Sequence, residues 1–136
     1  MVDEAATRRV VEQLYDAYLG GDPAGMLTLM AEDVHVRFLG QSSLHGIEET
    51  RRFFDFAAGL LTDLDFRIDR RIVDGEWAAV TWSETARTAA GEPWENHGVD
   101  VIRVVEGEIV VLHENNDVRQ VHRHFPRYEN QAANGR

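Results

Sequence analysis

Apolar side chains recur every three to four residues in the first half of the chain, which is typical of amphipathic helices. Residues 4–19 are the clearest case, because charged residues separate the apolar ones. The sequence "GGDP" at 20–23 ends this helix and starts another, since Asp22 is a good N-cap and Pro23 suits a first helical position. The pattern predicts helices at about 4–19, 23–31 and 46–60, with an alternating strand at 33–39.

After residue 62 the apolar positions alternate with a period of two, which indicates half-buried strands. Asp74-Gly75 and Glu106-Gly107 provide the chemistry of tight hairpin turns. The predicted strands are 65–75, 76–88, 94–107 and 108–118. Because the helices come first and the hairpins follow, the order predicts an α+β fold with a mostly antiparallel sheet. We expect a single domain over residues 1–118 and a C-terminal tail, 119–136, that is partly ordered at most.

Composition narrows the range of partners. The formal net charge of −10 disfavours binding to nucleic acid or to an anionic membrane. One basic cluster, Arg119, His122, Arg123, His124 and Arg127, is interpreted as a solvated tail on an acidic surface. No apolar run approaches the ~20 residues of a membrane span, and the absence of cysteine fits the cytoplasm. A small hydrophobic ligand or a second copy of the chain is the expected partner.

Three segments carry a resemblance to a known family. They are "GDPAGMLTLMAEDVHV" after the first helix, "LHGIEETRRFF" in the third helix and "VDVIRVVEGEIV" at the last turn. Together they resemble the nuclear transport factor 2-like superfamily, in its SnoaL-like polyketide cyclase and ketosteroid isomerase branch, over about residues 5–118. The resemblance implies a conical α+β barrel, in which three N-terminal helices pack in a strongly curved sheet around a small-molecule pocket. Because this fold serves enzymes and non-catalytic proteins, function has to be argued from the site.

The ketosteroid isomerases have four functional positions that can be compared with this chain. The resemblance implies a tyrosine, a general-base aspartate, a second tyrosine and a protonated aspartate, and the chain has Leu14, Phe38, Phe54 and Asp100 there. Only the last position keeps its functional group. Steroid isomerisation by that mechanism is therefore disfavoured, and the first three residues are expected to line an apolar pocket.

The SnoaL-like cyclases and the limonene-type epoxide hydrolases resemble the chain at a different acid. In both groups an acid follows the glycine of the last turn by about ten residues, which corresponds to Asp117. The Arg-x-Asp pair of the epoxide hydrolases falls on Trp82 and Glu84. The arginine is lost and the carboxylate is kept, so epoxide hydrolysis becomes a weaker alternative.

Strand parity groups these residues independently of the resemblance. Trp82 and Glu84 share one face of their strand, and His113, Asn115 and Asp117 share a face if the last strand is regular. A bulge near 113–116 would reassign the second group. Each acid also has an alternative as an exposed surface residue, and the sequence leaves that choice open.

The leading hypothesis is a cofactor-independent acid–base enzyme that acts on a small, mostly apolar carbonyl compound, as an aldol-type cyclase or isomerase. Desolvation and neighbouring negative charge raise a carboxyl pKa, so one acid of a buried set stays protonated while another ionises. The expected catalytic residues are Asp117 as acid or base, Asp100 and Glu84 as further carboxyls, and His113 as their assistant. The expected pocket residues are Leu14, Tyr18, Phe38, Phe54, Trp82 and Asn115.

Two alternatives have no catalytic step. The chain could be a ligand-binding module, or an assembly module that acts as a homodimer through the outer face of its sheet. The outer-face expectation rests on Arg103, Val105 and the apolar run 109–112, which suggest a sheet covered on both faces. No metal is expected, because His122 and His124 lie in the tail without an obvious third ligand.

Overall fold

The computed structural model describes residues 2–38 and 43–125. Leu39 at the end of the strand predicted at 33–39, and residues 126–136 of the predicted tail, lie outside the described residues. In chain order the elements are α1 (Glu4–Leu19), α2 (Pro23–Thr28), β1 (Met30–Arg37), β2 (Ser43–His45), α3 (Ile47–Ala57), β3 (Leu61–Asp74), β4 (Trp77–Thr88), β5 (Pro93–Val105), β6 (Glu108–Asn116) and α4 (Val118–His124).

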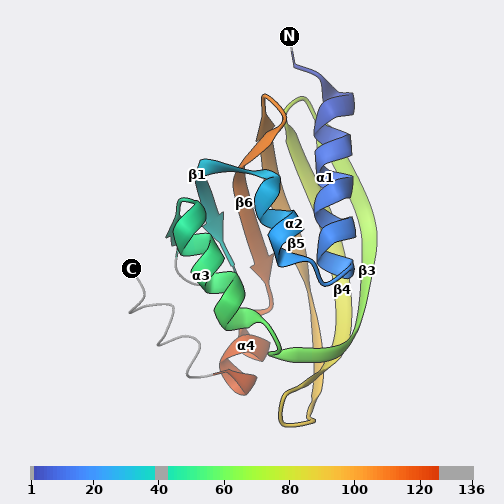
Figure 1. Ribbon diagram of the computed structural model, residues 1–136. Coiled ribbons are helices and arrows are strands. Elements are labelled where there is room, and N and C mark those ends of the chain that lie inside the picture. Colours follow the sequence, from blue (N-terminus) through green and yellow to red (C-terminus); the bar gives the residue numbers. More distant parts are fainter. Residues whose placement is uncertain (1, 39–42, 126–136) are drawn as a thin grey trace.

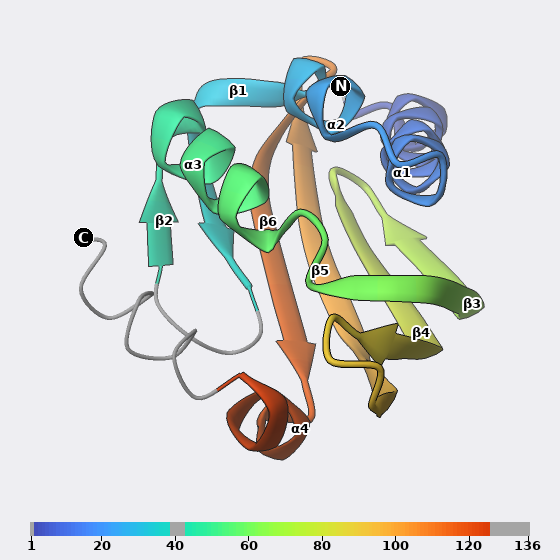
Figure 2. The ribbon, with the colours of Figure 1, turned by 60° about the horizontal axis from the view of Figure 1, so that its bottom comes forward.

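The six strands of the described residues belong to one sheet with the order β2-β1-β6-β5-β4-β3. Strands β3 to β6 form three successive hairpins, and β1 joins the sheet by parallel pairing with β6. Figures 1 and 2 show the sheet curling around the helices, with α1 and α3 on its concave side. The predicted fold class, an α+β cone with a mostly antiparallel sheet, is confirmed.

Helix α1 provides much of the core because its apolar residues lie on the face toward the sheet. Val10, Val11, Leu14 and Tyr15 are buried there. They pack in one cluster with apolar residues of α2, α3 and the inner face of the sheet. None of the described helices is long and apolar enough to cross a membrane.

Strands β1 and β3 begin earlier than predicted, at Met30 rather than 33 and at Leu61 rather than 65. Two helices end earlier than predicted. Helix α2 ends at Thr28 rather than near residue 31, because Met30 already pairs with Ile109 in the sheet. Helix α3 ends at Ala57 rather than at 60, since Ala58 is extended and Gly59 has a positive φ of 83°.

Two short elements were not predicted from the sequence. Strand β2 pairs with β1 as an edge strand. Helix α4 follows β6 directly, and its Val121 packs with Ala86 and Trp94.

Candidate active site

Strands β4 and β5 direct alternate side chains toward the helices, and four of these inner-face residues are polar and buried: Glu84, Thr88, Asn96 and Asp100. Glu84 of β4 pairs with Asn96 of β5, and Asp100 lies farther along the same face. Glu84, Asn96 and Asp100 are 8%, 2% and 7% exposed, respectively. Polar groups buried to this extent need partners, because desolvation is costly. These residues make the inner face of β4 and β5 partly polar.

Asp100 accepts a hydrogen bond on each carboxyl oxygen. Tyr15 Oη donates to Oδ2 at 2.5 Å, and Trp82 Nε1 donates to Oδ1 at 3.0 Å. Gly98 makes room for the indole, because a Cβ at that position would lie 2.9 Å from the Trp82 ring. Burial raises the pKa of Asp100 to about 6, although both hydrogen bonds oppose the rise. Asp100 is thus held between α1 and β4.

Glu84 has a different arrangement, in which one carboxyl oxygen is fixed and the other is available. Trp94 Nε1 donates to Oε1 of Glu84 at 3.0 Å. Within residues 2–38 and 43–125, no hydrogen bond to Oε2 is found. Burial raises the pKa of Glu84, and the hydrogen bond from Trp94 opposes that rise. A carboxylate fixed at one oxygen and open at the other is suited to accept a proton from a ligand.

Tyr18 of α1 brings a phenolic hydroxyl close to these carboxyls. Its ring meets Phe66 edge-on, with ring centroids 5.2 Å apart. Burial raises the pKa of Tyr18, and the charges of Glu84, Glu114 and Asp100 raise it further. Its hydroxyl therefore stays protonated at neutral pH and forms no hydrogen bond to any residue that the structure describes. A protonated, unpaired hydroxyl is a suitable donor to a ligand oxygen.

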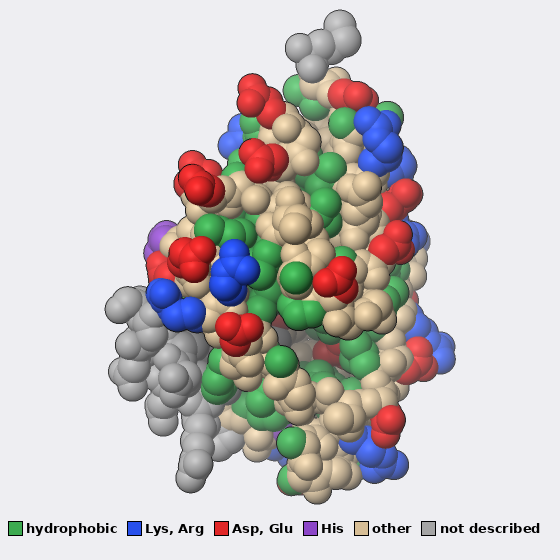
Figure 3. Space-filling model, viewed as in Figure 1, with side chains coloured by type: hydrophobic (Ala, Val, Ile, Leu, Met, Phe, Trp, Pro, Cys, Tyr) green, Lys and Arg blue, Asp and Glu red, His purple; other side chains and the backbone are tan. Residues whose placement is uncertain are grey.

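Aromatic and aliphatic residues surround this polar group. Phe38 stacks on Phe53 with ring centroids 4.9 Å apart and contacts Phe54 at 5.7 Å. Leu14 is buried in the same cluster, and Trp82 lies on the inner face of β4. Figure 3 shows a recess where α1, α3 and β3 approach one another, bordered by hydrophobic side chains and with an acidic side chain inside. The predicted pocket walls on α1, on α3 and just after β1 thus belong to one apolar cluster, and Trp82 stacks on Phe66 of that cluster. Their contact with a ligand stays a prediction.

His113 and Asn115 do share a face of β6, but that face points out of the cone because the strand contains a bulge at Val110. Val104 pairs with Ile109 while Arg103 pairs with Val111, so β6 has one extra residue between them. An extra residue exchanges the two faces of the strand beyond it. As a result Glu114 and Asn116 share the face of Asp100 and Gly98.

The residues His113, Asn115 and Asp117 consequently do not share the inner face. His113 Nε2 lies 2.8 Å from Nδ1 of His35, and Asn115 accepts from Arg37 Nη2 at 3.1 Å, on the outer side. Burial and the charge of Arg37 lower the pKa of His113. A hydrogen-bonded outer-face histidine cannot assist an acid inside the cone.

Asp117 is the N-cap of α4. Its Oδ1 accepts from the backbone N of Arg119 at 3.1 Å and from Arg119 Nε at 3.0 Å. The Arg119 side chain lowers the pKa of Asp117. These contacts describe a helix cap, and none of them places Asp117 beside Glu84 or Asp100.

Sequence reasoning missed Asn96 and Glu114, and it interprets Tyr15 and Trp94 only as core or pocket-wall residues. Tyr15 and Trp94 have ordinary core positions in the sequence pattern, and only the structure shows their polar atoms bonded to carboxyls. Asn96 has the parity of Asp100 and could have been found from it. Glu114 could not, because its face depends on the bulge.

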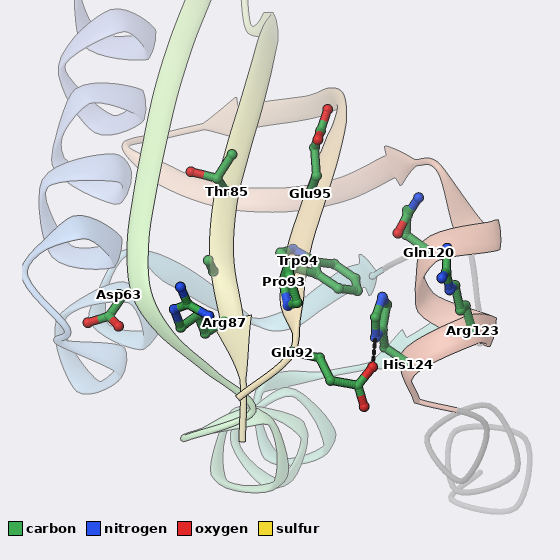
Figure 4. A pocket seen from close by; sticks show the side chains of 11 residues that line it. Asp63, Thr85, Arg87, Glu92, Pro93, Trp94, Glu95, Gln120, Arg123 and His124 are labelled. Carbon is green, nitrogen blue, oxygen red and sulfur yellow. Dashed lines mark ion pairs between the residues drawn. The ribbon is translucent and has the colours of Figure 1, made fainter. Parts of the chain in front are cut away.

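A second cavity, of about 590 Å³, lies between α4 and the ends of β4 and β5. Trp94, Arg87, Arg123 and His124 are among its lining residues, and Figure 4 shows the ion pair between Glu92 and His124 at its edge. Trp94 therefore stands between this cavity and Glu84. Across the described part of the chain, no three His, Cys, Asp or Glu residues are grouped so as to hold a metal ion.

The fold belongs to a known family. Residues 11–112 match the SnoaL-like domain family, and the chain is a member of that family. The curated proteins gave no match.

Solved structures with the same fold include proteins of several descriptions. A nuclear transport factor 2-like protein of unknown function from Burkholderia pseudomallei has a TM-score of 0.78 and 22% identity, covering 87% of this chain and 95% of its own. A candidate SnoaL-like polyketide cyclase from a Jannaschia species has a TM-score of 0.77 and 16% identity, with coverages of 87% and 90%. A candidate ketosteroid isomerase from Kribbella flavida has a TM-score of 0.71 and 24% identity, with coverages of 86% and 82%. At these identities the likeness establishes the fold.

Proposed function

We propose that this protein is a cofactor-independent acid–base enzyme that acts on a small, mostly apolar carbonyl compound, as an isomerase or an aldol-type cyclase. One observation carries the proposal: the inner face holds a buried carboxylate, Glu84, with an available oxygen, together with the unpaired hydroxyl of Tyr18. A base and a hydrogen-bond donor in an apolar recess are what proton abstraction beside a carbonyl requires.

In the proposed reaction Glu84 removes a proton from the carbon next to the carbonyl, and the C–H electron pair forms the enolate. Tyr18 donates a hydrogen bond to the oxygen on which the negative charge develops. An isomerase would return the proton from Glu84 to a different carbon. An aldol-type cyclase would let the enolate carbon attack a second carbonyl, and the new alkoxide would take the proton from Glu84.

Asp100 is proposed to position the site rather than to exchange protons with the substrate. Both its oxygens are already engaged by Tyr15 and Trp82. Trp82 occupies the position of the hydrolase arginine and donates to Asp100, which gives Glu84 no cationic partner there and disfavours the epoxide hydrolase alternative. His113 and Asp117 are left out of the proposed chemistry because they do not face the recess.

The direct test measures α-proton exchange. The protein is incubated in D₂O at neutral pH with a series of cyclic ketones, and loss of the α-proton signal is followed by ¹H NMR. We expect at least one ketone to exchange about tenfold or more above buffer, since positioned general bases contribute about 10²–10⁴-fold. Protein unfolded in urea is the control. If ketones bind but exchange only at the buffer rate, the chain is a ligand-binding module instead.

We also propose that a second copy covers the outer face of the sheet. Trp77 and Ile72 on this face are 42% and 53% exposed. Trp77 lies under the guanidinium of Arg103 at 5.4 Å, and Arg103 Nε donates to Glu76 at 2.8 Å. An exposed aromatic residue with a fixed arginine is typical of the centre of a protein interface.

Sedimentation equilibrium tests this interface. We expect the wild-type protein to have twice the monomer mass at micromolar concentration. Val101→Glu, which puts a charge in the middle of the outer face between the partners Ala79 and His113, should give a folded monomer, because an unpaired charge is costly to bury. Leu19→Glu, at an exposed apolar position on α1, should leave the dimer intact. A monomeric wild-type protein would refute the proposal.

A further inference from the structure

Asn96 has a buried amide that is oriented by the backbone and yet has an unused donor. Its Oδ1 accepts from the backbone N of His97 at 2.8 Å and from the backbone N of Asp117 at 3.1 Å. These two donors fix which end of the amide is oxygen, because the NH₂ group could not accept from them. The remaining atom, Nδ2, is buried and has no hydrogen-bond partner among the described residues.

Asn116 leaves the complementary atom unused. Its Nδ2 donates to Oε2 of Glu114 at 3.0 Å, which fixes its orientation in the same way. Its Oδ1 is buried and likewise finds no partner in the described part of the chain. Asn116 pairs with Gly98, two residues from Asn96 on the same inner face. An unused donor and an unused acceptor therefore occur at neighbouring inner-face positions.

Unpaired buried polar atoms cost free energy, and folded proteins contain few of them. A hydroxyl group can pair with both atoms, because it accepts one hydrogen bond and donates another. A ketone oxygen can pair only with the donor, and a hydrocarbon can pair with neither. The chemistry of the two atoms thus selects among ligands that otherwise have the same shape.

We propose that Asn96 is a specificity-determining residue, whose Nδ2 donates to a hydroxyl oxygen of the substrate while Asn116 Oδ1 accepts from the same hydroxyl. The substrate class is then a hydroxy-substituted ketone, with its carbonyl at Tyr18 and its hydroxyl at the asparagines. This inference rests on the proposed function for the position of the substrate carbonyl. The evidence for the hydroxyl is independent and consists of the unpaired atoms of Asn96 and Asn116.

The experiment measures binding without turnover. The probes are 1-tetralone, its 5-, 6- and 7-hydroxy derivatives and the corresponding methyl ethers, and dissociation constants come from protein-observed NMR titrations. We expect the best hydroxy isomer to bind at least about tenfold more tightly than 1-tetralone, because it satisfies two atoms that otherwise stay unpaired. Its methyl ether, which accepts but cannot donate, should lose most of that preference.

The decisive variant is Asn96→Asp, which keeps the oxygen that accepts from the backbone and replaces the unused donor with an acceptor. The tenfold preference should fall to about one in this variant. Asn115→Asp makes the same chemical change on the outer face and should leave the preference unchanged. A wild-type preference near one for every isomer, or a preference that survives in Asn96→Asp, overturns the inference.

These outcomes are separate from those of the proposed function. A loss of unfolding free energy in Asn96→Asp with an unchanged hydroxyl preference would mean that the amide holds a buried water molecule, which also overturns the inference. Absence of proton exchange with an intact hydroxyl preference would refute the catalytic proposal and leave the role of Asn96 standing.

Discussion

Replacing Glu84 with Gln is expected to slow α-proton exchange by about 10²–10⁴-fold, the contribution usual for a positioned general base. The amide keeps an oxygen that can accept from Trp94 Nε1, so the side chain retains its place. What it loses is the ability to take a proton at neutral pH. Initial exchange rates at saturating ketone, measured by ¹H NMR in D₂O, give the effect directly.

The matched control is Glu95→Gln, at an exposed position on the neighbouring strand. It removes the same charge from the protein and should leave the exchange rate unchanged. Ketone binding in Glu84→Gln should also persist, since Tyr18 and the apolar walls are untouched. If Glu84→Gln keeps full exchange activity, Glu84 is not the catalytic base.

The inner-face residues of β4 and β5 could be predicted from the sequence, because these two strands pair without a bulge. Period-two alternation put Trp82 and Glu84 on one face, and the register places them there. Asp100 was found through its position in the family, and its burial agrees with the inner-face assignment. In a regular strand, alternate residues point to opposite faces, so the direction of each side chain follows from its position in the sequence.

The inner-face residues of β6 could not be predicted from the sequence, because one extra residue, Val110, decides which side chains of the strand face inward. With a regular strand, Ile109, Val111 and His113 would share a face; the bulge at Val110 instead puts Leu112 and Glu114 inside. The run from 109 to 112 is apolar at every position, so hydrophobicity gives no sign of which residue is extra. Register in such a run is set by packing against the helices and β5, which a local pattern does not contain.

The role of Asp117, just after β6, also could not be predicted from the sequence alone. A carboxyl at that distance from the turn fits the family position of a catalytic acid, and it also fits an N-cap. The backbone turns away after Asn116 into α4, so the side chain caps the helix and pairs with Arg119. Helix α4 is too short to show a helical period, and its only signal was the cap itself.

The second large effect concerns stability and belongs to Asp100. Its pKa is about 6 in the folded protein, against an ordinary value of 3.8. The folded state therefore binds more protons than the unfolded state between these two values. By linkage, the contribution of Asp100 to the free energy of unfolding falls as pH rises from about 4 to about 6 and changes no further above that range.

The shift of about two pKa units corresponds to about 3 kcal/mol of unfolding free energy, because each unit is worth about 1.4 kcal/mol. Asp100→Asn cannot titrate, and whatever it loses in hydrogen bonding to Tyr15 and Trp82 is independent of pH. Unfolding free energies from urea denaturation at pH 4, 5, 6 and 7 isolate the effect as a difference between the two proteins. Wild type minus Asp100→Asn should fall by about 3 kcal/mol across this range. Glu84 titrates in both proteins, so its direct contribution cancels, and a difference that stays constant with pH would mean that Asp100 is already ionised at pH 4.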